Sequence, residues 1–164
     1  MGKGQFNMDH AEAARRLFLQ GYNCAQAVLV TFAEELGMDR ETASRLSLSF
    51  GAGMGGLREV CGAASGMFMC AGLKFGTADM TAPDALAKKK EHYQRIQKMA
   101  AQFAERSGGS IICRELLGLA PKKAPVEADA NCAQPRTAEY LKKRPCIELV
   151  GDAAEIFASM LQSP

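Results

Sequence analysis

The chain has 164 residues, of which 48% are hydrophobic and 23% are charged, and these values fit one globular domain rather than a disordered chain. The formal net charge is only +2, and basic residues alternate with acidic ones, so nothing indicates a nucleic-acid partner. The sequence contains no apolar run of about 18 residues, the length that would predict a membrane-spanning helix.

The N-terminal part of the sequence predicts three capped helices. Residues 1–8 are expected to form a flexible tail ahead of them. Three side chains, Asp9, Asn23 and Asp39, each precede an amphipathic stretch and can accept a hydrogen bond from a first-turn N–H group. The three helices are therefore expected at about residues 10–20, 24–37 and 40–50.

A glycine-rich run from Gly51 to Gly56 follows, and we expect its backbone to pass close to a functional site. A fourth helix is predicted from about 60 to 74, although Gly62, Gly66 and Gly72 each weaken it by up to about 1 kcal/mol relative to alanine. Close backbone packing against a neighbour would offset this loss. The G-x-x-x-G spacing of the first two suits such packing, either within the chain or across a homodimer.

The second half of the sequence predicts a long helix that starts between residues 81 and 84 and ends near 106, then a short helical turn over 110–117. Residues 119–136 contain three prolines and are expected to form a loop. A further turn at Thr137 and a last helix over 145–161 complete the chain. Residues 110–113 are the best strand candidate, and their strand signal is weak. We therefore expect residues 1–164 to form a single all-α domain, an irregular bundle of about five or six helices.

One segment resembles an export signal. Arg15 and Arg16 look like a twin-arginine motif, but the following apolar segment has no small-residue cleavage site, and the pair fits the polar face of a helix. We therefore expect a cytoplasmic protein that has no membrane association and whose thiols stay reduced.

Four of the six cysteines share one kind of position, the first turn of a predicted helix. They are Cys24, Cys61, Cys113 and Cys146. First-turn N–H groups lack intrahelical partners and the helix dipole is positive there, so a thiolate is stabilised and its pKa is expected to fall. These four residues are the candidate redox-active and metal-binding residues.

The other two cysteines, Cys70 and Cys132, are interpreted as bystanders. Cys70 lies nine residues beyond Cys61, which is the opposite face of a regular helix, and Cys132 lies in the proline-containing loop. The chain has no C-x-x-C pair, so any shared site must be assembled by the fold. It also has no C-x-x-C-H motif, which excludes a covalent c-type haem.

The cysteine pattern resembles a known family of redox-active proteins, which is named for its successive C, CGAxxG, C and C motifs. The resemblance covers about residues 10–160 and is carried by Asn23-Cys24-Ala25-Gln26-Ala27, Cys61-Gly62-Ala63-Ala64-Ser65-Gly66, Cys113 with Glu115-Leu116-Leu117-Gly118, and Cys146. It implies that these four cysteines are the family's set and that Cys70 and Cys132 are additional. A similar domain occurs in a cytochrome that carries haem and also holds an iron–sulfur centre. Because this chain lacks the haem motif, the resemblance implies only the iron–sulfur centre here.

The function we expect is electron transfer or redox sensing, with a redox partner protein. Four thiolates match the ligand number of an iron–sulfur cluster, which we prefer as the cofactor. The alternative redox mechanism is thiol–disulfide exchange without a cofactor. Outside the redox class, the alternative is a structural zinc site or an interaction module with inert thiols. Any enzymatic activity would be of the oxidoreductase type.

Overall fold

The computed structural model describes residues 9–163, so the predicted tail over 1–8 lies outside the described residues. Within residues 9–163 the chain forms nine helical segments, and its helical class agrees with the prediction. They are α1 (His10–Leu19), α2 (Cys24–Phe32), α3 (Arg40–Leu48), α4 (Gly51–Met54), α5 (Gly62–Phe75), α6 (Ala85–Arg106), α7 (Cys113–Leu116), α8 (Ala138–Lys143) and α9 (Cys146–Gln162). In α4, Ala52 and Gly53 have left-handed dihedral angles, so this segment is a turn. Eight helices remain in this part of the chain, and the predicted number of five or six was too low.

The three predicted caps form as the sequence indicates. Asp9 and Asp39 accept first-turn N–H groups at 3.2 and 2.8 Å. Asn23 and Gln26 form a reciprocal capping box with bonds of 2.9 and 3.0 Å. The helix that begins after Asn23 is shorter than predicted, because it ends at Phe32 and a turn leads on to Gly37.

The core lies between α1, α2, α5 and α9. The last helix packs against the other three, α2 packs along α5, and α6 covers the outer side of α5 and α9. The largest fully buried side chains are aromatic and aliphatic, and they include Phe18, Phe32, Phe103, Phe157 and Leu29. This packing fixes the directions of the helices whose first residues are cysteines.

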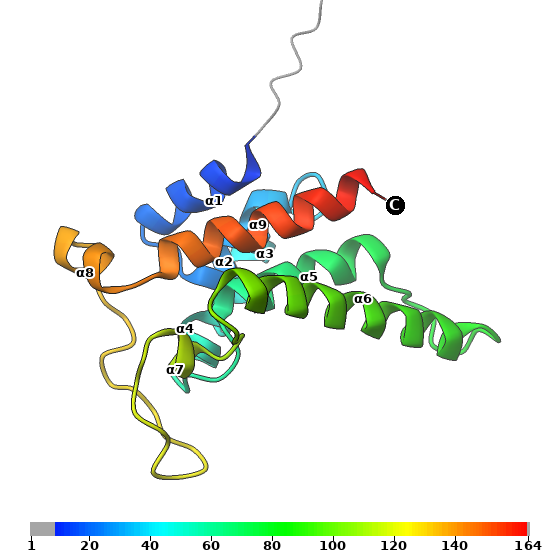
Figure 1. The fold of residues 1–164 in the computed structure, drawn as a ribbon. Coiled ribbons are helices and arrows are strands. Elements are labelled where there is room, and N and C mark those ends of the chain that lie inside the picture. Colours follow the sequence, from blue (N-terminus) through cyan, green and yellow to red (C-terminus); the bar gives the residue numbers. More distant parts are fainter. Residues whose placement is uncertain (1–8, 164) are drawn as a thin grey trace, which may run out of the picture.

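One end of the bundle gathers the short elements. In Figure 1, α4, α7 and α8 lie at the same end as the starts of α5 and α9. An isolated antiparallel bridge joins Val60 to Ile112, so the predicted strand candidate over 110–113 contributes a single bridge. Backbone bonds from Cys61 N to Ile111 O (2.7 Å) and from Cys113 N to Glu59 O (2.6 Å) flank the bridge. Two cysteine-bearing segments that are distant in sequence are thereby held together.

Across residues 9–163, no helix is both long and apolar enough to cross a lipid bilayer.

Candidate functional site

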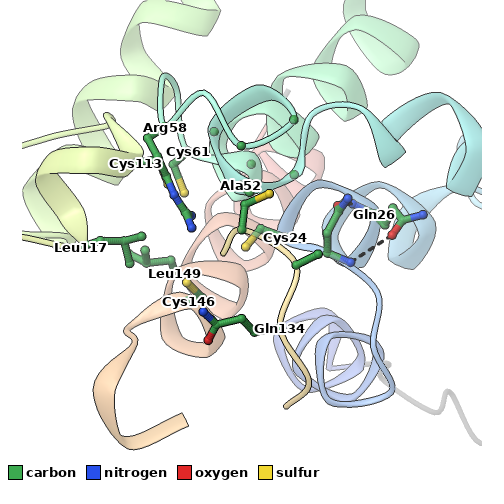
Figure 2. Close-up of a pocket in the computed structure, with 18 of the residues that line it drawn as sticks. Cys24, Gln26, Ala52, Arg58, Cys61, Cys113, Leu117, Gln134, Cys146 and Leu149 are labelled. Atoms are coloured by element: carbon green, nitrogen blue, oxygen red, sulfur yellow. Dashed lines mark hydrogen bonds between the residues drawn. The ribbon is translucent and has the colours of Figure 1, made fainter. Parts of the chain in front are cut away.

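A cavity of about 390 Å³ opens at the end of the bundle where the short elements gather. Its lining includes all four candidate cysteines, Cys24, Cys61, Cys113 and Cys146. Figure 2 shows these residues, with Arg58, arranged around one space. Cys24 is partly exposed, and the other three are buried. The structure thus brings together the four cysteines that the sequence singles out, although they are far apart in the chain.

Each of these cysteines stands at the start of a helix. Cys24, Cys113 and Cys146 are the first residues of α2, α7 and α9, and Cys61 is the N-cap of α5. Because first-turn N–H groups have no partners within their helix, this arrangement directs backbone donors toward the sulfur atoms. At Cys61, the N–H groups of Ala63 and Ala64 lower the pKa of the thiol and so partly offset the effect of burial.

Glycines allow the backbone to approach the cysteines closely. A Cβ atom on Gly53 would lie 2.7 Å from the Cβ atom of Cys113, and one on Gly62 would lie 3.0 Å from that of Cys24. Gly53 also has a φ of 65°, in the left-handed region that suits glycine. The glycine-rich run over 51–56 therefore borders the cavity, as the sequence predicts, and its glycines have a steric role there.

Burial prevents most of these thiols from ionising easily. It raises the pKa of Cys61 to about 12 and raises that of Cys113, although Arg58 partly offsets the second effect. The pKa of Cys24 is raised because its thiol donates to Cys146 and because it is buried. All six pairs among the four cysteines also repel when ionised. The expectation that helix starts lower each pKa was therefore wrong for three of the four, since burial outweighs the backbone donors.

Cys146 is the exception among the four. Its pKa is lowered to about 6, first because the Cys24 thiol donates to its thiolate and then because Tyr140 donates and Arg144 is near. Burial acts in the opposite direction but is outweighed. Cys24 and Cys146 therefore titrate as a pair, in which the lower pKa lies at Cys146.

Two residues of the site were missed by the sequence analysis. Arg58 has a side chain that is only 6% exposed, and its Nη1 atom donates to the Cys113 sulfur at 3.5 Å. Cys132 was interpreted as a bystander, yet it lines the same cavity. No local pattern marks either residue, because both reach the site through loops. Cys70 lies apart from the site, fully buried in the hydrophobic core.

Four cysteine sulfurs are a ligand set that two kinds of metal site use. Among the side chains of residues 9–163, no three Cys, His, Asp or Glu residues are grouped closely enough to hold one metal ion. A structural zinc ion needs its four ligands around one point, about 2.3 Å from each sulfur. The ligands of an iron–sulfur cluster instead surround a larger inorganic core. The four cysteines that line the cavity are the residues that would hold a group of either kind.

Comparisons with known proteins agree with the cysteine pattern. A family model described as "Putative redox-active protein (C_GCAxxG_C_C)" matches residues 22–160, which is most of the chain and includes all four site cysteines. Searches of curated proteins and of solved structures give no significant match. The chain therefore belongs to the C_GCAxxG_C_C family of redox-active proteins.

Proposed function

We propose that Cys24, Cys61, Cys113 and Cys146 together bind one iron–sulfur cluster, through which the protein transfers electrons or senses redox state. The observation that carries this proposal is the convergence of four thiols from four helix starts on one cavity. Four cysteine thiolates are the usual ligand set of [2Fe–2S] and [4Fe–4S] clusters. When bound, such a cluster supplies a one-electron carrier.

The electrostatics of the cysteine site supports the same proposal. Burial and mutual repulsion raise the pKa of Cys24, Cys61 and Cys113, so an empty site holds these thiols neutral. Thiols that coordinate a metal lose their protons, because the cations compensate the thiolate charge. Four cysteines that line one cavity and repel one another as thiolates are therefore suited to surround positive charge.

The protein backbone would hold and tune the bound thiolates. The first turns of α2, α5 and α9 present N–H groups that lack intrahelical partners, and those of Ala63 and Ala64 favour the thiolate form of Cys61. Hydrogen bonds to ligand sulfurs stabilise the more reduced, more negative state and so raise the reduction potential. We expect a redox partner protein to exchange the electrons and the cytoplasm to keep the empty site reduced.

Thiol–disulfide chemistry is the second candidate, and the contact between Cys24 and Cys146 favours it. Cys24 and Cys146 are each the first cause of the other's pKa shift, so the two thiols interact strongly. Their oxidation would form one S–S bond of about 2.05 Å, release the one proton of the Cys24 thiol and pass two electrons to an acceptor such as a partner disulfide, which is reduced to two thiols. This mechanism leaves Cys61 and Cys113 without a role, which is why we rank it second.

Anaerobic expression with added iron, followed by absorption and EPR spectroscopy, tests the proposal. We expect a brown protein that contains iron and sulfide and gives the absorption of a cluster, with an EPR signal in one of its oxidation states. An iron-free, colourless protein in which Cys24 and Cys146 cycle reversibly with a dithiol reductant would overturn the cluster and support the second candidate. One tightly held zinc ion per chain would contradict both.

A further inference from the structure

Arg58 stands out because it is a charged residue in the wall of the cavity. It lies between α4 and α5 and has a φ of 57°, in the left-handed region that non-glycine residues rarely adopt. Its backbone is held on two sides, since its N–H donates to Ala52 O (3.3 Å) and its carbonyl accepts from Arg114 N (3.2 Å). This unusual backbone directs a buried guanidinium to the cysteine site.

The guanidinium of Arg58 joins a site cysteine to a distant loop. Its Nη1 atom donates to the sulfur of Cys113 at 3.5 Å. Its Nε and Nη2 atoms both donate to one carboxylate oxygen of Asp129, at 2.9 and 2.7 Å. The pKa of Asp129 is lowered chiefly by these bonds from Arg58, so the pair is ionic. A single buried cation therefore contacts both the Asp129 carboxylate and the sulfur of a candidate cluster ligand.

Asp129 belongs to residues 119–136, which we call the strap. The strap supplies part of the cavity wall through Cys132, Ala133 and Gln134. The N–H group of Asp129 donates to Gly56 O at 2.9 Å, and a Cβ atom on Gly56 would come within 2.8 Å of the Cys132 sulfur. The middle of the strap is thus fixed against the glycine-rich turn at the same point where Arg58 binds Asp129.

A second arginine anchors the far end of the strap. Arg136 donates from Nε to Phe18 O (3.3 Å) and from Nη2 to Tyr22 O (3.2 Å), and its guanidinium lies 4.1 Å from the centre of the Phe18 ring. These contacts bind the strap to the end of α1 and to the turn before α2. These contacts include no hydrogen bond to a site cysteine, although Arg136 lines the cavity and its charge helps to lower the pKa of Cys146.

We propose that Arg58 is a positioning residue with two linked roles. It compensates negative charge at the cysteine site, and it holds the strap in place beside the cavity. Its positive charge compensates negative charge at Cys113, and its ion pair with Asp129 holds the strap over the cavity. The charge role rests on the proposed cluster function, whereas the strap role does not. A buried cation near a redox centre favours the more negative, reduced state, so Arg58 raises the reduction potential.

Two variants separate the two roles of Arg58. Arg58→Gln removes the charge and the ion pair, so we expect the cluster potential to become more negative than in the wild type. Asp129→Asn keeps the Arg58 charge and removes its counter-charge, so the potential should not become more negative. Arg58→Lys keeps the charge without the planar group and should lie closer to the wild type than Arg58→Gln does. The potentials are read from the cluster absorption in the full chain.

Amide hydrogen exchange of the metal-free, reduced protein tests the strap directly. Both Arg58→Gln and Asp129→Asn should speed exchange in peptides containing Asp129 by about tenfold, because each removes charge-assisted bonds that hold the strap. Exchange in α6, which lies away from the site, should remain at the wild-type rate and shows that the variants fold.

Different results would contradict the charge role and the strap role of Arg58. A wild-type protein that binds no iron contradicts the proposed function, and the exchange experiment still decides the strap role. A cluster-containing Arg58→Gln protein with the wild-type potential overturns the charge role. Unchanged exchange at Asp129 in both variants overturns the strap role.

Discussion

Cys146 is the one cysteine of the site whose pKa is lowered, whereas the pKa values of the other three are raised. The Cys24 thiol donates to Cys146, the Tyr140 hydroxyl donates as well, and Arg144 is near. The same negative charge contributes to raising the pKa of Tyr140 to about 12, although burial is the main cause there. In the reduced, metal-free site one thiolate is therefore stabilised while the others stay protonated.

This arrangement predicts a pH profile for alkylation. Because the pKa of Cys146 is lowered, its thiolate persists as the pH falls and is lost only through about pH 6. In metal-free, reduced protein we expect iodoacetamide to modify Cys146 at a rate that levels off above this midpoint and falls below it. Peptide mass spectrometry measures the rate for this residue alone.

Replacement of the hydrogen-bond donors tests the cause of the low midpoint. Cys24→Ala removes the strongest donor, so the midpoint should move to higher pH, and Tyr140→Phe should move it in the same direction by less. Cys70→Ala serves as the matched control, because Cys70 lies in the core away from the cavity. A midpoint that stays near pH 6 in Cys24→Ala would show that the thiol pair is not its cause.

Among the helices, the contact between α2 and α5 explains two of the three glycines of α5. A Cβ atom on Gly66 would lie 2.7 Å from the carbonyl oxygen of Ala25 and 3.0 Å from the Cβ atom of Val28. Gly62 is similarly crowded, with Phe50 O at 3.0 Å. Gly72 has open space instead. The expected close packing is thus present at two of the three glycines and absent at the third.

Alanine substitutions at two of these positions should have opposite effects. Gly66→Ala forces α2 and α5 apart, because the obstructing atoms belong to the backbone, and should destabilise the fold by about 1–3 kcal/mol. Gly72→Ala occupies open space within the same helix and should stabilise it by about 0.5–1 kcal/mol through the lower entropy of the unfolded chain. Urea unfolding of both variants measures the difference in the free energy of unfolding.

Gly66→Ala and Gly72→Ala are controls for each other, because both replace a glycine of α5 by alanine. Effects of equal sign at Gly66 and Gly72 would contradict the close approach of the two helices. Gly66 lies four residues beyond Gly62, which packs against Cys24. We therefore also expect Gly66→Ala to displace Cys24 from its position in the cysteine site.

At the scale of the whole molecule, local signals predicted the longer helices well. Asp9, Asn23 and Asp39 cap their helices with their own side chains, so each signal lies within four residues of the helix it starts. The short helices α7 and α8 have only 4 and 6 residues, too few for a periodic apolar pattern. The sequence analysis therefore predicted only turns at these two places, over 110–117 and at Thr137, and the predicted number of helices was too low.

The cysteine site was only partly predictable for the same physical reason. The sequence signals of a helix start lie close to it along the chain, so the sequence identified Cys24, Cys61, Cys113 and Cys146 as candidates. The contact of Arg58 with Asp129 joins residues 71 positions apart, and Cys132 reaches the cavity through the same strap. The pKa values depend on burial, which the fold determines. No local pattern reports on a contact or a burial of this kind.

The central claim is that four particular cysteines act as one ligand set. The most direct test is the iron content and cluster absorption of six variants, all prepared anaerobically with added iron. They are Cys24→Ser, Cys61→Ser, Cys113→Ser, Cys146→Ser, Cys132→Ser and Cys70→Ala. We predict that each of the first four loses most of its iron and colour and that the last two keep both. A variant of the four that keeps a full cluster, or a loss of iron in Cys132→Ser equal to theirs, would contradict this ligand set.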